Sequence, residues 1–127
     1  MIAGLGTDIV EMDRIRKAVE KSDLFAAYLL SSAELALIAD WSVSRKVEFM
    51  AGRWAAKEAF AKALGTGLGA KCSFADLTIL PGENGVPVLS GITGSAAETW
   101  KEKGIVKAHI SISHERHYAM ATVLLER

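Results

Sequence analysis

The stretch Gly52-Arg53-Trp54-Ala55-Ala56-Lys57-Glu58-Ala59-Phe60-Ala61-Lys62-Ala63-Leu64-Gly65-Thr66-Gly67 decides the fold. From Ser44 to Leu64 the chain has no proline, only one glycine and abundant alanine, so it favours a helix that ends at Gly65. Turned by about 100° per residue, this helix carries large apolar side chains on one side and small ones on the other. The large ones are Val47, Phe49, Met50, Trp54, Phe60 and Leu64, and the small ones are Gly52, Ala51, Ala55, Ala59 and Ala63. The pattern predicts a central helix that is buried on two faces.

Charged residues interrupt this apolar helix at Arg53, Lys57, Glu58 and Lys62. A buried charge must be paired, bind a ligand or reach water, because desolvation of a lone ion is costly. Glu58 and Lys62 lie four residues apart, so the simplest interpretation is a helix salt bridge worth about 0.2–0.5 kcal/mol. Taken alone, these residues favour that structural interpretation.

Composition limits the class of protein. The 127 residues suffice for one domain with a core, so residues 1–127 are expected to form a single domain. Half of the residues are apolar and the formal net charge is zero, which is typical of a soluble globular protein and excludes a strongly basic nucleic-acid binder. The single cysteine, Cys72, excludes internal disulfides and a thiolate zinc site. It suits a reducing, cytoplasmic compartment and is expected to be a small core or edge residue.

Neither secretion nor membrane insertion is expected. The chain starts with Met1-Ile2-Ala3-Gly4-Leu5-Gly6, without a charged segment followed by a long apolar run. No apolar stretch approaches the length of a membrane span.

Short elements are predicted on both sides of the central helix. Before it, we expect a strand over Met1–Thr7 that ends at Asp8, a helix over Val10–Lys21, and two short helices within Asp23–Asp40, the second of which starts with a capping box at Ser31. Ser44 is the expected N-cap of the central helix. After the central helix, we expect strands over Phe74–Leu80 and Val86–Leu89, a helix over Gly91–Lys103, and a hairpin made of His109–His114 and His117–Leu125.

Several polar residues allow two interpretations. Asp8 is either a turn or helix-start carboxylate or a metal ligand fixed by a strand. The basic stripe Arg14, Lys17 and Lys21 is by default a solvated helix face. The Gly65–Gly67 turn is either a plain helix stop or a source of backbone N–H groups for phosphates, although the dipole at a helix C-terminus gives no help. A lone strand histidine such as His109 is usually structural.

Three blocks of this sequence resemble the holo-[acyl-carrier-protein] synthases, the small 4′-phosphopantetheinyl transferases. The first is Gly6-Thr7-Asp8-Ile9-Val10-Glu11. The second, residues 54–67, matches the family pattern F-A-A-K-E-A-x-x-K-A-x-G-T-G without a gap, and the third, residues 109–114, matches H-x-S-x-S-H. Two residues depart from the family: Trp54 replaces a phenylalanine, and Tyr28 stands where an arginine is common. The first departure changes packing volume, and the second removes or moves one carrier-binding charge.

The resemblance implies an α+β fold, with a small antiparallel β-sheet packed on the long central helix. It also implies transfer of the 4′-phosphopantetheine arm of coenzyme A to a serine of apo acyl carrier protein in fatty acid biosynthesis, with release of adenosine 3′,5′-bisphosphate. Asp8 and Glu58 would bind Mg²⁺, and Lys62 would neutralise the pyrophosphate. Lys57 and the Gly65-Thr66-Gly67 turn would be phosphate neighbours.

The resemblance also assigns partner contacts. Arg53 would touch nucleotide or carrier, and the region Asn84–Pro87, with Gly85 and Pro87, would border the coenzyme A nucleotide. Arg14, Lys17 and Lys21 would bind the acidic carrier, with help from Arg16. Family members are typically homotrimers with sites between subunits, so His109 would come from a different subunit than the two carboxylates. A water on the metal, a carboxylate and His109 all remain candidates for the general base.

Two other functions are compatible with the same residues. A non-enzymatic carrier-binding module would keep the basic stripe, but the intact pair of carboxylates and Lys62 argue against it. A Mg²⁺-dependent hydrolase of the coenzyme A pyrophosphate would differ from a transferase only in the acceptor.

Overall fold

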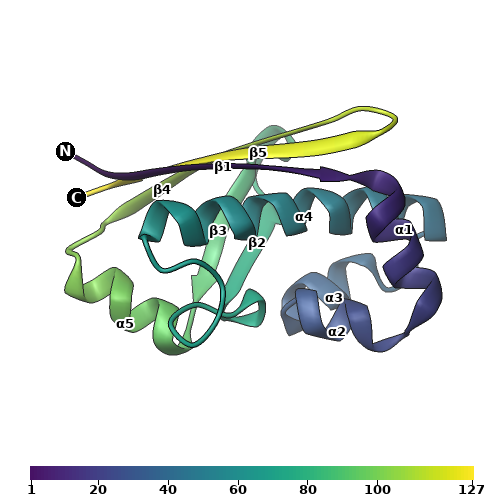
Figure 1. Cartoon of the computed structure of the whole chain (residues 1–127), viewed down its shortest axis with the longest axis horizontal. Coiled ribbons are helices and arrows are strands. Elements are labelled where there is room, and N and C mark those ends of the chain that lie inside the picture. Colours follow the sequence, from purple (N-terminus) through teal and green to yellow (C-terminus); the bar gives the residue numbers. More distant parts are fainter.

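Helix α4 (Val43–Leu64) runs through the middle of the molecule, as the sequence predicts. The structure is a computed structural model that describes residues 1–127, and Figure 1 shows the other elements arranged around this helix. Most of α4 is buried on both its large and its small side, including Ala51, Ala55 and Phe60. The helix ends where expected, because Gly65 adopts the left-handed conformation with φ 85°.

A three-stranded antiparallel sheet covers one side of α4. Its order is β1 (Ile2–Glu11), β5 (Tyr118–Glu126) and β4 (Lys107–His114). Two glycines let β1 lie directly on the helix: a Cβ added to Gly4 would lie 1.9 Å from the carbonyl oxygen of Ala63, and one added to Gly6 would lie 1.9 Å from that of Ala59. The small side of α4 is therefore the side that receives β1.

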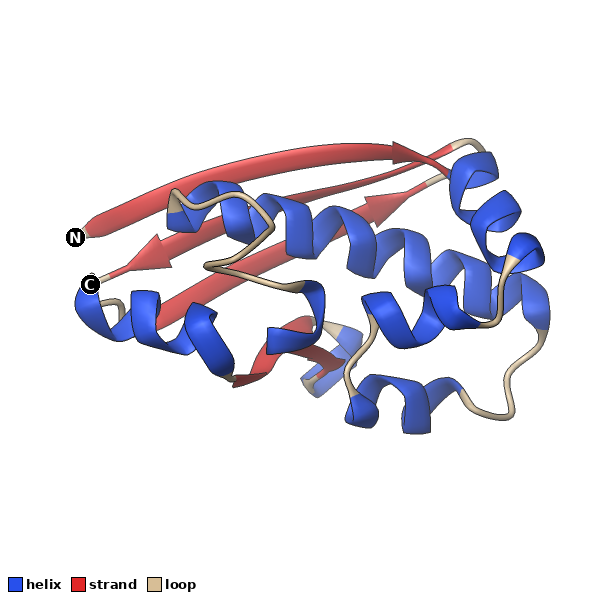
Figure 2. Cartoon of the chain, turned by 60° about the horizontal axis from the view of Figure 1, so that its bottom comes forward, coloured by secondary structure: helices blue, strands red, loops and turns tan.

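The remaining elements surround the two ends and the other side of α4, as Figures 1 and 2 show. Helices α1 (Met12–Lys21), α2 (Leu24–Leu29) and α3 (Ser32–Ile38) gather near its N-terminal half, and α5 (Gly94–Glu102) lies near its C-terminal end. A separate antiparallel hairpin is formed by β2 (Leu77–Pro81) and β3 (Pro87–Ile92). A mixed α and β fold with antiparallel sheets is thus confirmed.

One core joins these elements. It contains 27 buried hydrophobic residues, contributed by every helix and by the two sheets. Cys72 belongs to this core, as predicted, and burial raises the pKa of its thiol to about 11. The two ends of the chain meet, since the amino group of Met1 donates to the carbonyl oxygen of Arg127 at 2.9 Å. No helix is long and apolar enough to cross a membrane.

Several boundaries differ from the sequence prediction. Strand β1 continues beyond Thr7 to Glu11, because Asp8 pairs with Ala121 of β5, so Asp8 lies within the strand and not at its end. The N-cap of α4 is Ser42, whose hydroxyl accepts from the N–H of Arg45 at 3.3 Å, and not Ser44. Residues 74–76 form a short 3-10 turn before β2, and α5 begins only at Gly94. The capping box at Ser31 is confirmed.

Candidate active site

Strand β1 and helix α4 bring Asp8 and Lys62 together. The ammonium of Lys62 lies 3.2 Å from Asp8 Oδ1 and donates to the carbonyl oxygen of Thr7 at 3.0 Å. The Lys62 side chain is 51% exposed, whereas that of Asp8 is 16% exposed. The lysine therefore pairs across the fold with Asp8, and the helix salt bridge between Glu58 and Lys62 does not form.

Glu58 lies one turn before Lys62 on α4 and feels the same group of charges. Partial burial raises the pKa of its carboxyl, and the negative charge of Asp8 raises it further, while Lys62 and Arg14 act in the opposite direction. Glu58 is therefore a partly buried carboxyl beside a second carboxylate. A cation bound by both groups would relieve the repulsion between them.

The chemical nature of the two donor groups fits Mg²⁺. Two partly buried carboxylates from two rigid elements are oxygen ligands of the kind that Mg²⁺ prefers, and the ion commonly takes its remaining ligands from water and substrate phosphates. No histidine, cysteine or further acidic side chain joins these two carboxylates to form a group of three possible ligands. Asp8 and Glu58 would thus be the only protein side chains to hold the ion.

The glycine-rich turn follows this group of charges at the end of α4. Its N–H groups point back to the helix: those of Gly65, Thr66 and Gly67 all donate to the carbonyl oxygen of Ala61, at 3.1, 3.2 and 3.1 Å. The hydroxyl of Thr66 donates to the carbonyl oxygen of Gly67 at 2.8 Å. The turn therefore offers its shape and its small side chains to a ligand, and these three N–H groups are already bonded.

The basic stripe lies exposed on α1, as the sequence predicts for Arg14, Lys17 and Lys21. Arg14 is the member nearest to the acidic pair, since it lowers the pKa of Glu58, and its guanidinium lies 5.4 Å from the ring centroid of Trp54. Arg16 instead forms an ion pair with Asp13 at 2.5 Å on the same helix. Trp54, which replaces a family phenylalanine, thus provides a platform for Arg14.

A second group of basic residues lies on a different side of α4. A cleft of about 220 Å³ is lined by Trp41, Arg45, Glu48, Phe49, Gly52, Arg53, Ile112 and His114. The guanidinium of Arg45 stacks on Trp41 and that of Arg53 on Phe49, each 4.1 Å from the ring centroid. Burial lowers the pKa of Arg53 to about 10, so it stays charged at neutral pH.

The contribution of Arg45 to this cleft was missed in the sequence analysis. Each of the two arginines stacks on an aromatic ring four residues before it, and the spacing Trp41, Arg45, Phe49 and Arg53 was the available signal. Residues four apart in a helix share one face.

His109 lies on the opposite face of the sheet from Asp8. In the register, Asp8 stands beside Ala121 and Ile112, on the face toward α4, whereas His109 stands beside Leu124 and Leu5, on the outer face. Its Nε2 contacts Glu126 Oε1, and this hydrogen bond lowers the pKa of the Glu126 carboxyl. One chain therefore does not bring His109 to the two carboxylates.

Gly85 and Pro87 lie at the tip of the β2–β3 hairpin. Strand β3 lies next to β4, at the edge of the structure away from β1. Gly85 has φ 76° and open space where a Cβ would be. The predicted site residues thus form two groups within one chain. Asp8, Glu58, Lys62, the turn and Arg14 form the first, and Arg53, His109, Gly85 and Pro87 lie on the side of β4 and the hairpin.

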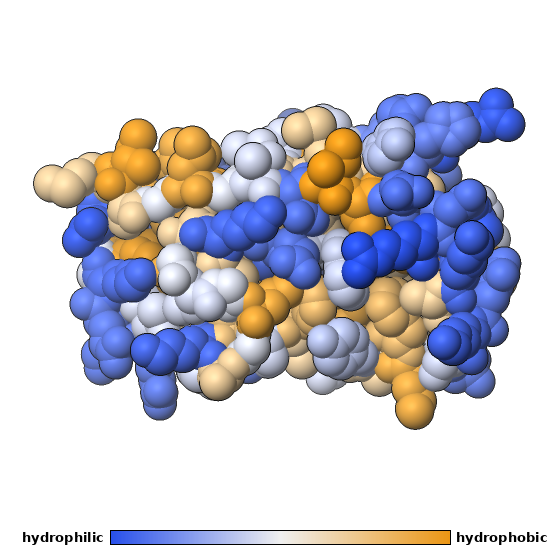
Figure 3. Space-filling view, viewed as in Figure 1, coloured by the Kyte–Doolittle hydropathy of each residue, from blue (hydrophilic) through white to orange (hydrophobic).

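The outer face of the sheet exposes several large apolar side chains. Leu5 and Ile9 of β1 are 64% and 63% exposed, and Tyr118 and Met120 of β5 are exposed next to them. Figure 3 shows apolar atoms along the upper edge of the molecule, over β1. His109 belongs to this same face.

Lys57 is not a phosphate neighbour, so this expectation is wrong. Its ammonium is completely buried and donates to Glu34 Oε1 at 2.6 Å and to the carbonyl oxygen of Leu29 at 2.8 Å. The Glu34 carboxylate also accepts from the N–H groups of Ser31 and Ile79, both at 2.8 Å. This buried ion pair ties α4 to α3 and β2, and Lys57 is part of the scaffold.

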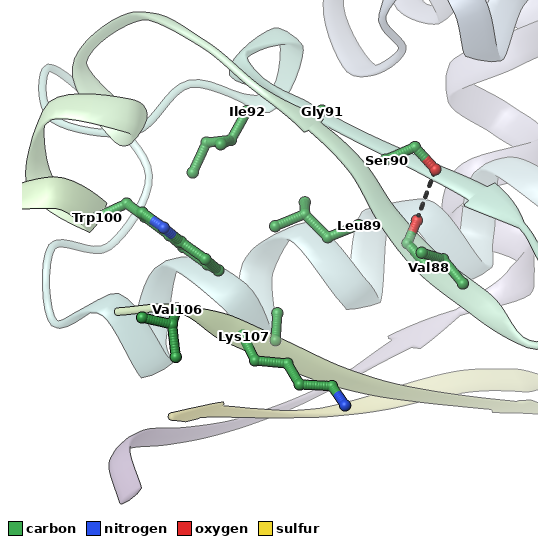
Figure 4. Close-up of a pocket in the computed structure, with 9 residues that line it drawn as sticks. Val88, Leu89, Ser90, Gly91, Ile92, Trp100, Val106 and Lys107 are labelled. Carbon is green, nitrogen blue, oxygen red and sulfur yellow. Dashed lines mark hydrogen bonds between the residues drawn. The ribbon is translucent and has the colours of Figure 1, made fainter. Parts of the chain in front are cut away.

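A more apolar cleft lies away from all of these charges. It has a volume of about 380 Å³ and lies between β3, α5 and β4, with Trp100 on one side and Leu89 and Ile92 on the other (Figure 4). No predicted site residue lines it. The candidate site is therefore the open, charged surface at β1 and α4 and not this cleft.

A long helix packs under an antiparallel sheet, and two carboxylates and a lysine lie where the two meet. This is the arrangement that the resemblance to the 4′-phosphopantetheinyl transferases implies. The family model of the 4′-phosphopantetheinyl transferase superfamily matches residues 4–123. The chain belongs to this superfamily and, within it, to the family of the holo-[acyl-carrier-protein] synthases.

Both curated relatives and solved structures support this assignment. The chain is 43% identical over 127 residues to a holo-[acyl-carrier-protein] synthase of Geobacillus sp. (strain WCH70), covering 100% of this chain and 98% of the relative. The crystal structure of the synthase from Neisseria meningitidis superposes with a TM-score of 0.91 at 35% identity over the whole of both chains. The synthase of Bacillus anthracis, solved in complex with CoA (3′,5′-ADP), has a TM-score of 0.82 at 38% identity and covers 98% of this chain and 96% of that one.

Proposed function

We propose that this protein transfers the 4′-phosphopantetheine arm of coenzyme A to a serine hydroxyl of apo acyl carrier protein. One observation carries the proposal: in a chain of this family, β1 and α4 bring Asp8, Glu58 and Lys62 together from segments about fifty residues apart. The relatives' names and the complex with coenzyme A in Bacillus anthracis identify the donor and the acceptor. Fatty acid biosynthesis in the cytoplasm is the process that such a carrier serves.

In this reaction the serine oxygen attacks the phosphorus that carries the pantetheine arm, and adenosine 3′,5′-bisphosphate leaves. The negative charge of the pyrophosphate repels the nucleophile and must be neutralised before attack. Lys62 is suited to this task, because half of its side chain is exposed and its ammonium is held beside Asp8 by Thr7. Gly65 and Thr66 lie within three or four residues of Lys62 and border the phosphates through their small size.

Asp8 and Glu58 hold Mg²⁺ in this proposal. When bound, the ion neutralises phosphate charge and polarises the phosphoryl group. The chain supplies the two carboxylates on a strand and a helix that pack directly on one another. Burial and the charge of Asp8 raise the pKa of Glu58, and a cation bound between the two carboxylates would oppose that second effect.

The complete site is proposed to form between copies of the chain in a homotrimer. Asp8 and His109 lie on opposite faces of the sheet, and the hairpin tip lies at the far edge from β1. Leu5 and Ile9 lie on the exposed outer face of the sheet. A neighbouring copy that covers this face would bring its own Arg53, His109 and hairpin tip to the Asp8 and Glu58 pair of this chain. Head-to-tail contacts of this kind close into rings.

In that assembly Arg53, His109, Gly85 and Pro87 bind the nucleotide part of coenzyme A. Arg53 is fixed for this role, because its Nε donates to the carbonyl oxygen of Ile79 at 2.8 Å while its guanidinium stacks on Phe49. His109 is the one histidine proposed to act in the site, either on the nucleotide or as a base. Two guanidinium groups in one cleft suit the phosphates of the nucleotide.

Acyl carrier protein docks on α1. Arg14, Lys17 and Lys21 form an exposed basic stripe there, and the charge of Arg14 acts on Glu58, whose pKa it lowers. The serine of a carrier bound to this stripe would therefore lie near the acidic pair. The separation of the carrier surface from the nucleotide cleft allows both substrates to bind at once. Residues 1–127 form a single domain in this proposal, consistent with their one core.

Product analysis tests the proposed function. Wild-type protein, Asp8→Asn and Glu58→Gln are incubated with coenzyme A and Mg²⁺, with and without apo carrier, and adenosine 3′,5′-bisphosphate is measured by chromatography. The transferase releases the bisphosphate only when the carrier is present, and both variants release it very slowly. Release without carrier would favour a hydrolase, and carrier binding without any release would favour a binding module.

A further inference from the structure

The turn after α4 is an unfavourable place for a phosphate on two counts. It lies at the C-terminal end of a helix, where the macrodipole is negative. The N–H groups of Gly65, Thr66 and Gly67 already donate to the carbonyl oxygen of Ala61. An anion beside this turn therefore needs positive charge from elsewhere, in addition to Lys62.

Lys103, just after α5, supplies positive charge at that point. Its ammonium donates to the carbonyl oxygen of Leu64, the last residue of α4. It also lies next to the turn, because a Cβ added to Gly65 would be 2.9 Å from Lys103 Nζ. Lys103 thus binds a carbonyl group of the last helical turn and opposes the negative end of the dipole.

Helix α5 holds the rest of the glycine-rich segment through two further contacts. The hydroxyl of Ser95 donates to the carbonyl oxygen of Ala70 at 2.8 Å. The carboxylate of Asp76 accepts from the N–H of Ser73 at 3.2 Å and from the N–H of Ala96 at 3.4 Å. The segment between α4 and β2 is therefore attached to α5 at its start, middle and end.

We propose that Lys103 and Ser95 are positioning residues for coenzyme A, which hold the turn after α4 and offset the helix dipole where the substrate phosphates bind. This inference rests on the proposed function, since it takes coenzyme A as the ligand of the turn. Neither residue touches the reacting atoms. Their loss should weaken coenzyme A binding and leave the carrier surface on α1 and the rate at saturation nearly unchanged.

Calorimetric titration of coenzyme A tests the inference. It is carried out with Mg²⁺ and without carrier, so that no transfer takes place, on Lys103→Met, Lys103→Arg and Ser95→Ala. Two controls match them. Lys101→Met removes an exposed lysine of the same helix that makes no ion pair, and Ser90→Ala removes a hydroxyl that donates to Val88 within its own strand. Thermal unfolding of each variant and steady-state kinetics with carrier complete the set.

We expect Lys103→Met to raise the Kd of coenzyme A about fivefold to tenfold, as for a cation at a partly buried helix C-terminus. Lys103→Arg should recover most of this loss, Ser95→Ala should show a smaller one, and both controls should bind like wild type. The KM for carrier and kcat should stay within about twofold of wild type. An unchanged Kd for both Lys103→Met and Ser95→Ala, in a protein whose wild type binds coenzyme A and modifies the carrier, would overturn the inference alone. Absence of coenzyme A binding by wild type would overturn the proposed function together with it.

Discussion

Replacement of Lys62 by methionine distinguishes a catalytic role of this residue from a purely structural one. Methionine keeps most of the aliphatic stem and removes the charge that lies 3.2 Å from Asp8. Because the Lys62 side chain is 51% exposed, the pair should contribute at most about 1 kcal/mol to the free energy of unfolding. That corresponds to a loss in Tm of no more than about 5 °C for a chain of this size.

The effect on transfer should be much larger. An oriented cation on a reacting phosphate lowers the barrier by several kcal/mol, so we expect kcat/KM to fall at least about a hundredfold, or about 2.7 kcal/mol. The assay measures holo-carrier formation over a range of coenzyme A concentrations, and Tm is measured on the same preparations. Lys101→Met, on the exposed side of α5, is the control and should match wild type in both.

A particular combination of results would refute this reasoning. If Lys62→Met lowered Tm but transferred at a nearly normal rate, Lys62 would be only the structural partner of Asp8. Lys57 would not be the substitute cation, because it is completely buried against Glu34. The remaining positive charges near Glu58 would then have to come from Arg14 or from another subunit.

Further predictions concern the acidic pair, the carrier surface and the assembly. Asp8→Asn and Glu58→Gln should fold and transfer very slowly, and full turnover by either at ordinary Mg²⁺ would remove that residue from the metal site. The pKa of Glu58 is raised in the folded, metal-free protein, so the protonated carboxyl contributes to the free energy of unfolding fully below the ordinary pKa of 4.5, and this contribution is lost as pH rises through the raised pKa. Glu58→Gln should therefore have a Tm equal to or above that of wild type at about pH 7.5. Mg²⁺ affinity, measured by calorimetry, should weaken as pH falls through that raised pKa in wild type only. Arg14→Ala and Lys21→Ala should raise KM for the carrier, most at low salt, and leave KM for coenzyme A unchanged, whereas equal damage to both would indicate misfolding. Mixing and reassembling Asp8→Asn with His109→Ala subunits should restore part of the activity, and no recovery would contradict the proposal that each site combines residues of two copies.

Local sequence signals predicted most of the secondary structure. The alanine-rich stretch before Gly65 forms one helix because its residues have high helix propensity and no breaker precedes the glycine. Ser31 and Glu34 form a capping box because both partners lie within one turn. Strand β4 alternates as expected, with Ile110 and Ile112 toward α4 and His109 on the outer face. The boundary at Asp8 was misplaced because pairing with β5 extends the strand, and that pairing is invisible in the local sequence.

Side-chain partners were less predictable, because they join distant segments. Lys62 has a plausible partner four residues away in Glu58 but pairs with Asp8, which lies 54 residues away. Lys57 stands beside Glu58 in the sequence, yet the helix turns it into the core against Glu34. The local sequence around Lys103 predicts only a helix, and the contact of this lysine with Leu64 depends on how α5 packs. The family motif predicted which residues belong to the site, and the fold shows which of them lie together in one chain.

The intact mass of apo acyl carrier protein, before and after incubation with coenzyme A, Mg²⁺ and this protein, tests the central claim most directly. The account predicts that the carrier gains the mass of one phosphopantetheine group, that the gain is lost when its acceptor serine is replaced by alanine, and that Glu58→Gln protein produces almost none in the same time. A carrier of unchanged mass, in a reaction where wild-type protein binds both substrates, would contradict it.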